Sequence, residues 1–259
     1  KKAIECYKKA NELDDTVAED WNNLGYYYDN GYGTEVDKKK AFECYKKANE
    51  LDDTVAAHWY ILGYCYEDGT GTEVDKKKAF KYYKKANELD DTVALYWNKL
   101  GFCYNNGIGT EVDEKKAFEY FKKACELDDT DAVYWNNLGY CYNNGIGTEV
   151  DEKKAFEYYK KANELDDTEA WYWNKLGVCY DNGYGTEVDK KKAFECYKKA
   201  NELDNTFSLE SLGRCYLHGI GTKIDLEKAK EFLDKAQKLY PKDEEIIELL
   251  KELENANNE

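Results

Sequence analysis

The sequence predicts an all-α fold, a right-handed α-α superhelical solenoid of two-helix repeats with a period of 38 residues. Two observations predict this fold. Apolar residues recur with helical spacing on both sides of a glycine-rich turn. The dipeptide Leu-Gly also recurs, with a spacing of 38 residues four times and then of 36, at Leu24-Gly25, Leu62-Gly63, Leu100-Gly101, Leu138-Gly139, Leu176-Gly177 and Leu212-Gly213.

The first helix of each repeat is predicted by an apolar stripe around the Leu-Gly dipeptide. In the third full repeat, positions i, i+3, i+4 and i+7 of one helical face carry Trp97, Leu100, Gly101 and Tyr104. Thr92 or Asp91 is expected to cap the start of this helix, and Asn106-Gly107 is expected to end it.

The second helix follows the turn and carries a stripe of its own. Its core positions in the same repeat are Ala117, Phe118, Phe121 and Ala124. Asp113 is the expected N-cap, and the helix is expected to run to about Leu127. One hairpin cannot bury both apolar faces by itself, so neighbouring hairpins must stack into a linear array.

The period divides the chain into one repeat array, residues 1–259. The first segment, 1–15, is a partial repeat that holds a second helix only. Full repeats then span 16–53, 54–91, 92–129, 130–167 and 168–205, the last repeat spans 206–240, and 241–259 are a C-terminal capping helix and tail. The capping helix is expected from Asp243 to Glu254, with a frayed tail at 256–259.

Composition and charge exclude several classes of partner. The chain carries 54 acidic and 38 basic residues, a formal net charge of −16. Such a field repels nucleic-acid phosphates and anionic membranes, and it steers basic peptides inward. We therefore expect a protein or peptide partner, preferentially a basic one, with no nucleic acid and no membrane. The chain begins at Lys1 without a methionine, which indicates a trimmed start.

Residues for catalysis are scarce. The chain has only two histidines, His58 and His218, and two serines, Ser208 and Ser211, and the two histidines lie four repeats apart, so a catalytic triad is effectively excluded. There is no Cys-x-x-Cys pair, and the turn Asp29–Asp37 does not match the EF-hand spacing. We predict no enzyme activity, no cofactor and no metal site.

The nine cysteines are predicted to be free thiols that pack in the core. Five of them stand between core positions of the first helices, at Cys65, Cys103, Cys141, Cys179 and Cys215. Cys6, Cys44 and Cys196 occupy one position of the second helix, where other repeats carry Tyr82, Tyr120 and Tyr158. Exchange with tyrosine favours a packing role, and a reducing, cytoplasmic compartment is therefore expected.

The motif L-G-x-x-Y-x-x-G-x-G-x-x-x-D-x-x-K-A, from Leu100 to Ala117, resembles the Sel-one-like repeat (SLR), a relative of the tetratricopeptide repeat (TPR). The resemblance covers the chain from residue 1 to about 240. The link ELDDT is about two residues longer than is usual in that family. Cys125 stands where secreted members form a disulfide with the next helix, but Val133 and Trp135 occupy the partner positions here.

The repeats differ mainly at three positions of the first helix. One position carries Glu19, Ala57, Leu95, Val133 and Trp171. The next carries Asn22, Tyr60, Asn98, Asn136 and Asn174. The third carries Tyr26, Tyr64, Phe102, Tyr140, Val178 and Arg214. These positions stand at i, i+3 and i+7 and share one face, which the resemblance to tetratricopeptide arrays implies to be the lining of a concave groove.

This pattern predicts a protein-interaction scaffold that holds a peptide or protein on the concave face. Asparagines would clamp an extended backbone, and tyrosines would supply contact area at low entropy cost. An equally open interpretation is that these positions are packing and surface sites that vary freely. The alternative functions are a structural array that associates end to end through its uncapped N-terminal helix, and a synthetic or consensus-like array with no natural ligand.

Overall fold

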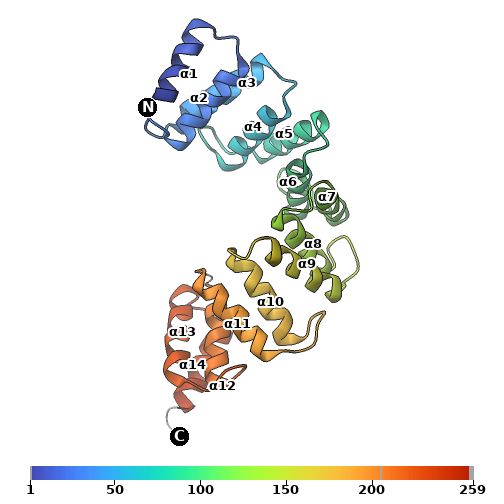
Figure 1. Ribbon diagram of the computed structural model, residues 1–259, viewed down its shortest axis with the longest axis vertical. Helices are drawn as coiled ribbons and strands as arrows, with labels where there is room; N and C mark the ends of the chain where they lie inside the picture. Colours follow the sequence, from blue (N-terminus) through green and yellow to red (C-terminus); the bar gives the residue numbers. More distant parts are fainter. Residues whose placement is uncertain (1, 205, 257–259) are drawn as a thin grey trace. The chain divides into compact units, whose positions relative to one another are not determined.

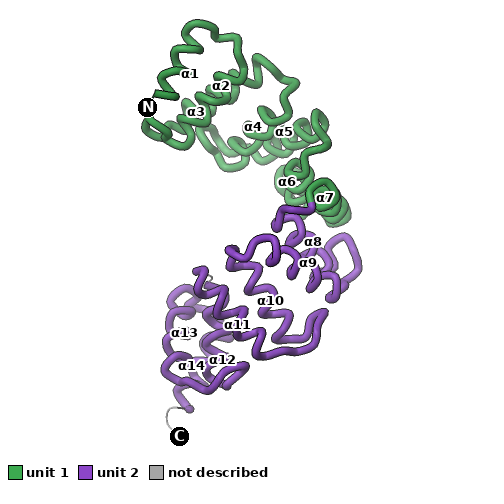
Figure 2. Tube along the Cα trace, viewed as in Figure 1, with its two compact units in different colours: residues 1–128 green, residues 129–259 purple. Residues whose placement is uncertain are grey.

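The computed structural model describes residues 2–204 and 206–256, and these form fourteen helices and no strand (Figure 1). The chain divides into two compact units, unit 1 with residues 1–128 and unit 2 with residues 129–259 (Figure 2). The predicted all-helical repeat fold is confirmed. Of the tail 256–259 that was expected to fray, Ala256 is the last residue of the final helix, and 257–259 lie outside the described residues.

Each unit alternates first and second helices of the repeat. Unit 1 holds α1 (Lys2–Leu13), α2 (Ala18–Asn30), α3 (Lys38–Leu51), α4 (Ala56–Asp68), α5 (Lys76–Leu89), α6 (Ala94–Asn106) and α7 (Glu114–Leu127). Unit 2 holds α8 (Ala132–Asn144), α9 (Glu152–Leu165), α10 (Ala170–Asn182), α11 (Lys190–Glu202), α12 (Ser208–His218), α13 (Leu226–Leu239) and α14 (Glu244–Ala256). The first helices are α2, α4, α6, α8, α10 and α12.

The turn inside each hairpin depends on two glycines with left-handed backbones. Gly107 ends α6 with φ of +66°, and its N–H donates to the carbonyl of Cys103. Gly109, with φ of +68°, presses on the preceding repeat, since a Cβ atom there would lie 1.9 Å from the carbonyl oxygen of Lys76. The first glycine therefore ends the helix, and the second brings the turn against the previous second helix.

The predicted caps are correct for the second helices and wrong for the first. Asp113 caps α7 as expected, accepting from the backbone N–H of Lys116 at 3.1 Å. The first helix α6 instead begins after Val93, which makes no side-chain cap. Thr92 is used in the link, where its N–H and hydroxyl donate to Asp90 Oδ1 at 3.0 and 2.6 Å. Turn formation in the link therefore takes the polar groups that we expected to cap the helix.

The core between the helices is built from alanines, leucines and large aromatic rings, such as Tyr96 and Phe121 in the third full repeat. Ala117, Ala124, Leu100 and Phe121 are buried, as the stripes predict. Trp97 is half-buried, and its indole N–H donates to the carbonyl of Asp91 at 2.8 Å, which ties the helix to the link.

The cysteines serve the same core. Eight of the nine are buried, and Cys6 is exposed, so the packing role holds for Cys44 and Cys196 but not for Cys6. All nine lie in the described part of the chain, and none of them forms a disulfide.

Unit 2 ends in a helix that differs from the repeats. α11 stops at Glu202, and Asp204 takes a left-handed backbone with φ of +64°, which accompanies the shorter spacing of the last repeat. Leu249 and Leu253 of α14 pack on Leu233 of α13, which is fully buried. Among the described helices none has the length and apolar character that a membrane span requires.

Candidate protein-interaction face

The first-helix face of unit 1 presents a row of exposed rings. Tyr26 on α2, Tyr64 on α4 and Phe102 on α6 occupy the same repeat position and are 50%, 46% and 44% exposed. Leu95 and Ala57, at the position seven residues earlier, are exposed as well. Large apolar side chains at one position on the first helices of three successive repeats give this face a row of exposed aromatic surface.

The middle position of this face is recessed. Asn22 and Asn98 are half-buried, and the side-chain oxygen of Asn22 is buried without a hydrogen-bond partner. Tyr60 packs between two rings, with centroid distances of 5.4 Å to Tyr83 and 5.2 Å to Tyr96. Of the predicted contact positions in unit 1, the outer two are therefore open and the middle one is largely engaged in packing between helices.

A charged pair lies beside the ring of Phe102. Lys99 Nζ is 2.7 Å from Glu67 Oε2, and it lies 5.6 Å from the Phe102 ring centroid. Glu67 also accepts from the hydroxyl of Tyr83 at 2.5 Å. Burial, and then this carboxylate, hold the pKa of Tyr83 well above its usual range. Tyr83 therefore stays protonated and acts as a fixed donor that orients Glu67.

Unit 2 presents a comparable face with different side chains. Val133 and Tyr140 on α8 and Trp171 on α10 are exposed, and Val178 is half-buried. Asn136 is half-buried, with a buried side-chain oxygen that lacks a partner, whereas Asn174 is only 7% exposed. The asparagines predicted to clamp a ligand thus lie deeper than the apolar residues around them.

The exposed indole of Trp171 is flanked by a cation and a ring. Lys175 Nζ lies 4.3 Å from the Trp171 ring centroid, and burial lowers the pKa of Lys175. Phe207 packs edge-on against the same indole, at a centroid distance of 5.6 Å. These contacts hold a large flat surface in one orientation, which suits recognition of a partner.

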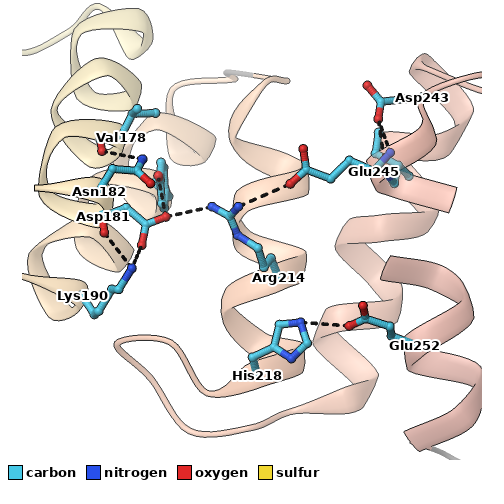
Figure 3. A network of polar contacts seen from close by, with 11 residues as sticks. Val178, Asp181, Asn182, Lys190, Arg214, His218, Asp243, Glu245 and Glu252 are labelled. Carbon is cyan, nitrogen blue, oxygen red and sulfur yellow. Dashed lines mark hydrogen bonds and ion pairs between the residues drawn. The ribbon is translucent and has the colours of Figure 1, made fainter. Parts of the chain in front are cut away.

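Arg214 is held in a polar network and is not free on the surface (Figure 3). Its guanidinium donates to Asp181 Oδ2 at 2.8 Å and lies 3.4 Å from Glu245 Oε1. Asp181 is 4% exposed and also accepts from Lys190 Nζ at 2.7 Å. Two cations therefore neutralise one buried carboxylate, which links α10, α11 and α12.

The repeat position that carries this carboxylate was not predicted from the sequence. It stands three residues after the third variable position, and its acidic members are Asp29, Glu67 and Asp181. Each one contacts a basic side chain, at Lys38, Lys99 and Arg214 respectively. The sequence does contain a signal for this position, because its residue varies from repeat to repeat. The basic partners lie on other helices, however, so the pairs cannot be predicted from spacing alone.

The side chains on the first-helix faces of the two units are suited to binding. Within the described ranges, no group of three or more His, Cys, Asp or Glu side chains has a geometry suited to a metal ion. Burial raises the pKa of Cys103 and Cys215 to about 12, so these thiols are neutral and poor nucleophiles. What the two faces offer is exposed aromatic and aliphatic area with fixed charged neighbours.

Solved structures show the same architecture. An antigen of uropathogenic Escherichia coli with an SLR fold, c5321, is 27% identical over 91% of this chain, with a TM-score of 0.75. This chain spans 48% of that protein, about half its length. A Sel1 repeat protein from Oxalobacter formigenes is 29% identical, with 85% of each chain covered and a TM-score of 0.73. YrrB, a TPR protein with an unusual peptide-binding site, shares the fold at 23% identity over 80% of this chain and 98% of its own, with a TM-score of 0.55.

Sequence comparison identifies the repeat itself. Among curated proteins, none is significantly similar in sequence to this chain. A model of the Sel1 repeat matches most of it, at residues 1–15, 22–53, 57–91, 98–129, 136–167, 174–205 and 207–238. Sel1 and tetratricopeptide repeat proteins are generally protein-interaction scaffolds and are typically not enzymes. With this match across its repeats, the chain belongs to the Sel1 repeat family.

Proposed function

We propose that this protein is a scaffold that binds an extended segment of a partner protein on its first-helix faces. The observation that carries the proposal is the row formed by Tyr26, Tyr64 and Phe102, which are exposed at the same position on the first helices of three successive repeats. Exposed apolar side chains that gather in one place commonly mark an interaction site. Tyrosine suits this role because it offers a large contact area and has few rotatable bonds to restrict.

The difference in burial between the apolar and the polar residues of the face supports an extended ligand. Outer apolar positions stand above a recessed polar layer that includes the partnerless oxygens of Asn22 and Asn136. A peptide backbone brings N–H donors, which are the groups that an unsatisfied side-chain oxygen needs. The side chains of the segment would meet the rings while its backbone faces the amides. YrrB, a protein of the same fold, is a precedent for peptide binding on such a scaffold.

Charge favours a basic segment. The formal net charge of −16 attracts cationic peptides over a distance of about one Debye length, roughly 8 Å at physiological salt. The face residues themselves are mainly apolar, so we expect charge to govern the association rate and the rings to govern how long the complex lasts. The affinity of a basic ligand should therefore fall with salt without disappearing.

A peptide library displayed on phage tests the proposal with the whole chain as bait. Peptides enriched on the wild type should be basic and should contain an apolar anchor. Replacement of Tyr26, Tyr64 and Phe102 together by serine should weaken their binding at least about tenfold, because exposed aromatic anchors carry much of the energy of an interface. Calorimetry with the synthetic peptides measures the loss.

A matched control removes an equal number of exposed apolar side chains elsewhere in unit 1. Val36, Val74 and Val112 are more than half exposed and lie in the turns within the hairpins. Their triple replacement by serine should leave the affinity of the enriched peptides unchanged. If those peptides bind the triple variant of Tyr26, Tyr64 and Phe102 as tightly as the wild type, the first-helix face is not the binding surface.

A further inference from the structure

A ring on the second helix fills the same aromatic slot in most repeats. In unit 1 the Tyr120 ring stands edge-on to Trp97, at a centroid distance of 5.1 Å, and edge-on to Tyr104, at 5.4 Å. Tyr82 makes the matching contacts one repeat earlier. Two rings of the first helix therefore form a slot whose shape fits one further aromatic ring.

In unit 2 the slot is filled on either side of one empty position. Tyr158 on α9 packs against Trp135, with a centroid distance of 5.3 Å. Phe232 on α13 stacks on Tyr216 at 5.7 Å. Between them, on α11, the corresponding residue is Cys196, whose side chain is too short to reach across the slot.

The structure has an open pocket where that ring is missing. The pocket has a volume of about 530 Å³ and lies between α9, α10 and α11. Its apolar wall is formed by Trp173, Leu176 and Tyr180, and Cys196 also lines it. Burial raises the pKa of the Cys196 thiol to about 12, so this part of the lining is neutral. Most of the remaining lining consists of charged side chains of α9 and α11, such as Lys160 and Lys192.

A buried amide also lines the pocket. Asn163 is only 7% exposed, and its side-chain nitrogen has no hydrogen-bond partner. Asn49 and Asn87, the equivalent residues beside filled slots, carry the same partnerless nitrogen, so a ring in the slot does not by itself satisfy it. A buried donor of this kind favours a ligand that brings an acceptor, such as a peptide carbonyl, along with its ring.

We propose that the pocket between α9, α10 and α11 binds the tyrosine or phenylalanine side chain of a partner protein, with the ring between Trp173 and Tyr180 and a carbonyl of the partner at Asn163. The chain itself shows the fit, because its own Tyr82 and Tyr120 rings occupy the equivalent slots. Cys196 acts here by its small size, which leaves room for the ring. The site lies apart from the first-helix face and does not depend on the function proposed for that face.

Titration with p-cresol, the side-chain analogue of tyrosine, tests the pocket. The six tryptophans give six indole N–H resonances in a nitrogen-15 spectrum, and a Trp173→Phe variant assigns the one of interest. p-Cresol should shift the Trp173 resonance saturably. In Cys196→Tyr the chain fills its own slot, so the saturable shift should be lost. If p-cresol leaves Trp173 unmoved in the wild type, or moves it equally in Cys196→Tyr, the proposal is overturned.

Two further variants serve as controls. Tyr120→Cys should open a new slot and add a saturable shift at the Trp97 indole, and the absence of that shift would contradict the slot geometry. Tyr140→Ser, on the exposed first-helix face of unit 2, should leave the Trp173 titration unchanged. Loss of the Trp173 shift in Tyr140→Ser would mean that p-cresol acts through the exposed face and would overturn the assignment.

A comparison of probes decides the source of the ring. N-acetyltyrosinamide carries the same ring together with peptide carbonyls, and it should bind more tightly than p-cresol. Replacement of Asn163 by alanine should remove that advantage and leave the p-cresol affinity unchanged. If p-cresol binds but N-acetyltyrosinamide does not, the pocket takes small phenols and the assignment to a protein side chain is wrong.

Discussion

Arg214 Nη2 lies 2.8 Å from Asp181 Oδ2, so that a cation on α12 is held by a carboxylate on α10 (Figure 3). The pair joins two successive first helices directly. Lys190 of α11 approaches the other oxygen of the same carboxylate at 2.7 Å. The network thus connects three helices of unit 2 through one buried acidic side chain.

Replacement of Asp181 by alanine should destabilise unit 2. Without the carboxylate, Arg214 and Lys190 lose their shared acceptor, and we expect a loss of about 1–3 kcal/mol in the free energy of unfolding. Urea denaturation followed by circular dichroism measures the change. Asp29→Ala is the matched control, because Asp29 has the same repeat position in unit 1 but is only half-buried and pairs with Lys38. Equal losses in both variants would contradict a special role for Asp181.

Glu210 should make the stability of unit 2 depend on pH. Burial, and then the carboxylate of Glu245, raise the pKa of Glu210 from its ordinary 4.5 to about 7, with Asp243 adding to the rise and Arg214 opposing it. The folded chain therefore keeps a proton that the unfolded chain releases. The contribution of this group is complete below pH 4.5 and is lost as the pH rises through about 7.

Glu210→Gln tests this dependence, because glutamine stays neutral at every pH. Relative to the wild type, the variant should gain about 1–2 kcal/mol between pH 4.5 and pH 8, a range that allows for solvent screening of a half-buried group. Thermal or urea unfolding at both pH values measures the gain. A difference between the two proteins that does not change with pH would show that Glu210 titrates normally.

Gly177→Ala should destabilise unit 2 more than Gly139→Ala. A Cβ atom on Gly177 would lie 2.6 Å from the Tyr197 ring, whereas one on Gly139 would lie 3.0 Å from the Tyr159 ring. Both variants gain about 1 kcal/mol of helix propensity. Overpacking costs about 1–3 kcal/mol and should outweigh that gain at the tighter site. The difference between the two unfolding midpoints is the measurement, and the opposite order would refute the packing argument.

Local chemistry explains which helix ends the sequence predicts correctly. The end of α6 at Asn106 and the start of α7 after Asp113 follow from a glycine and an aspartate that act on their own neighbours. The predicted cap at the start of α6 was wrong because Thr92 can either cap the helix or form a turn with Asp90. In the structure it forms the turn. Where one residue can satisfy two nearby structures, sequence alone does not decide between them.

Comparison of the repeats with one another predicted which residues form the candidate face. It did not predict how deeply each of these side chains is buried. Asn98, Asn136 and Asn174 look equivalent in sequence, yet Asn174 is buried and the other two are half-buried. The sequence also placed Arg214 among the contact residues without showing that Asp181 holds it. Burial and pairing depend on which side chains the next helix brings, and that depends on how neighbouring repeats stack.

The sequence by itself determined the helices, their turns and the family of the repeat, because period, glycine placement and aspartate caps act over a few residues. Only the tertiary structure decided whether a different residue at one repeat position fills the space between the helices or leaves a pocket. Cys196 and Tyr158 are alternatives in the sequence, but one leaves a pocket beside Trp173 and the other packs against Trp135. The volume of a side chain is local, whereas the space left around it is set by three helices together.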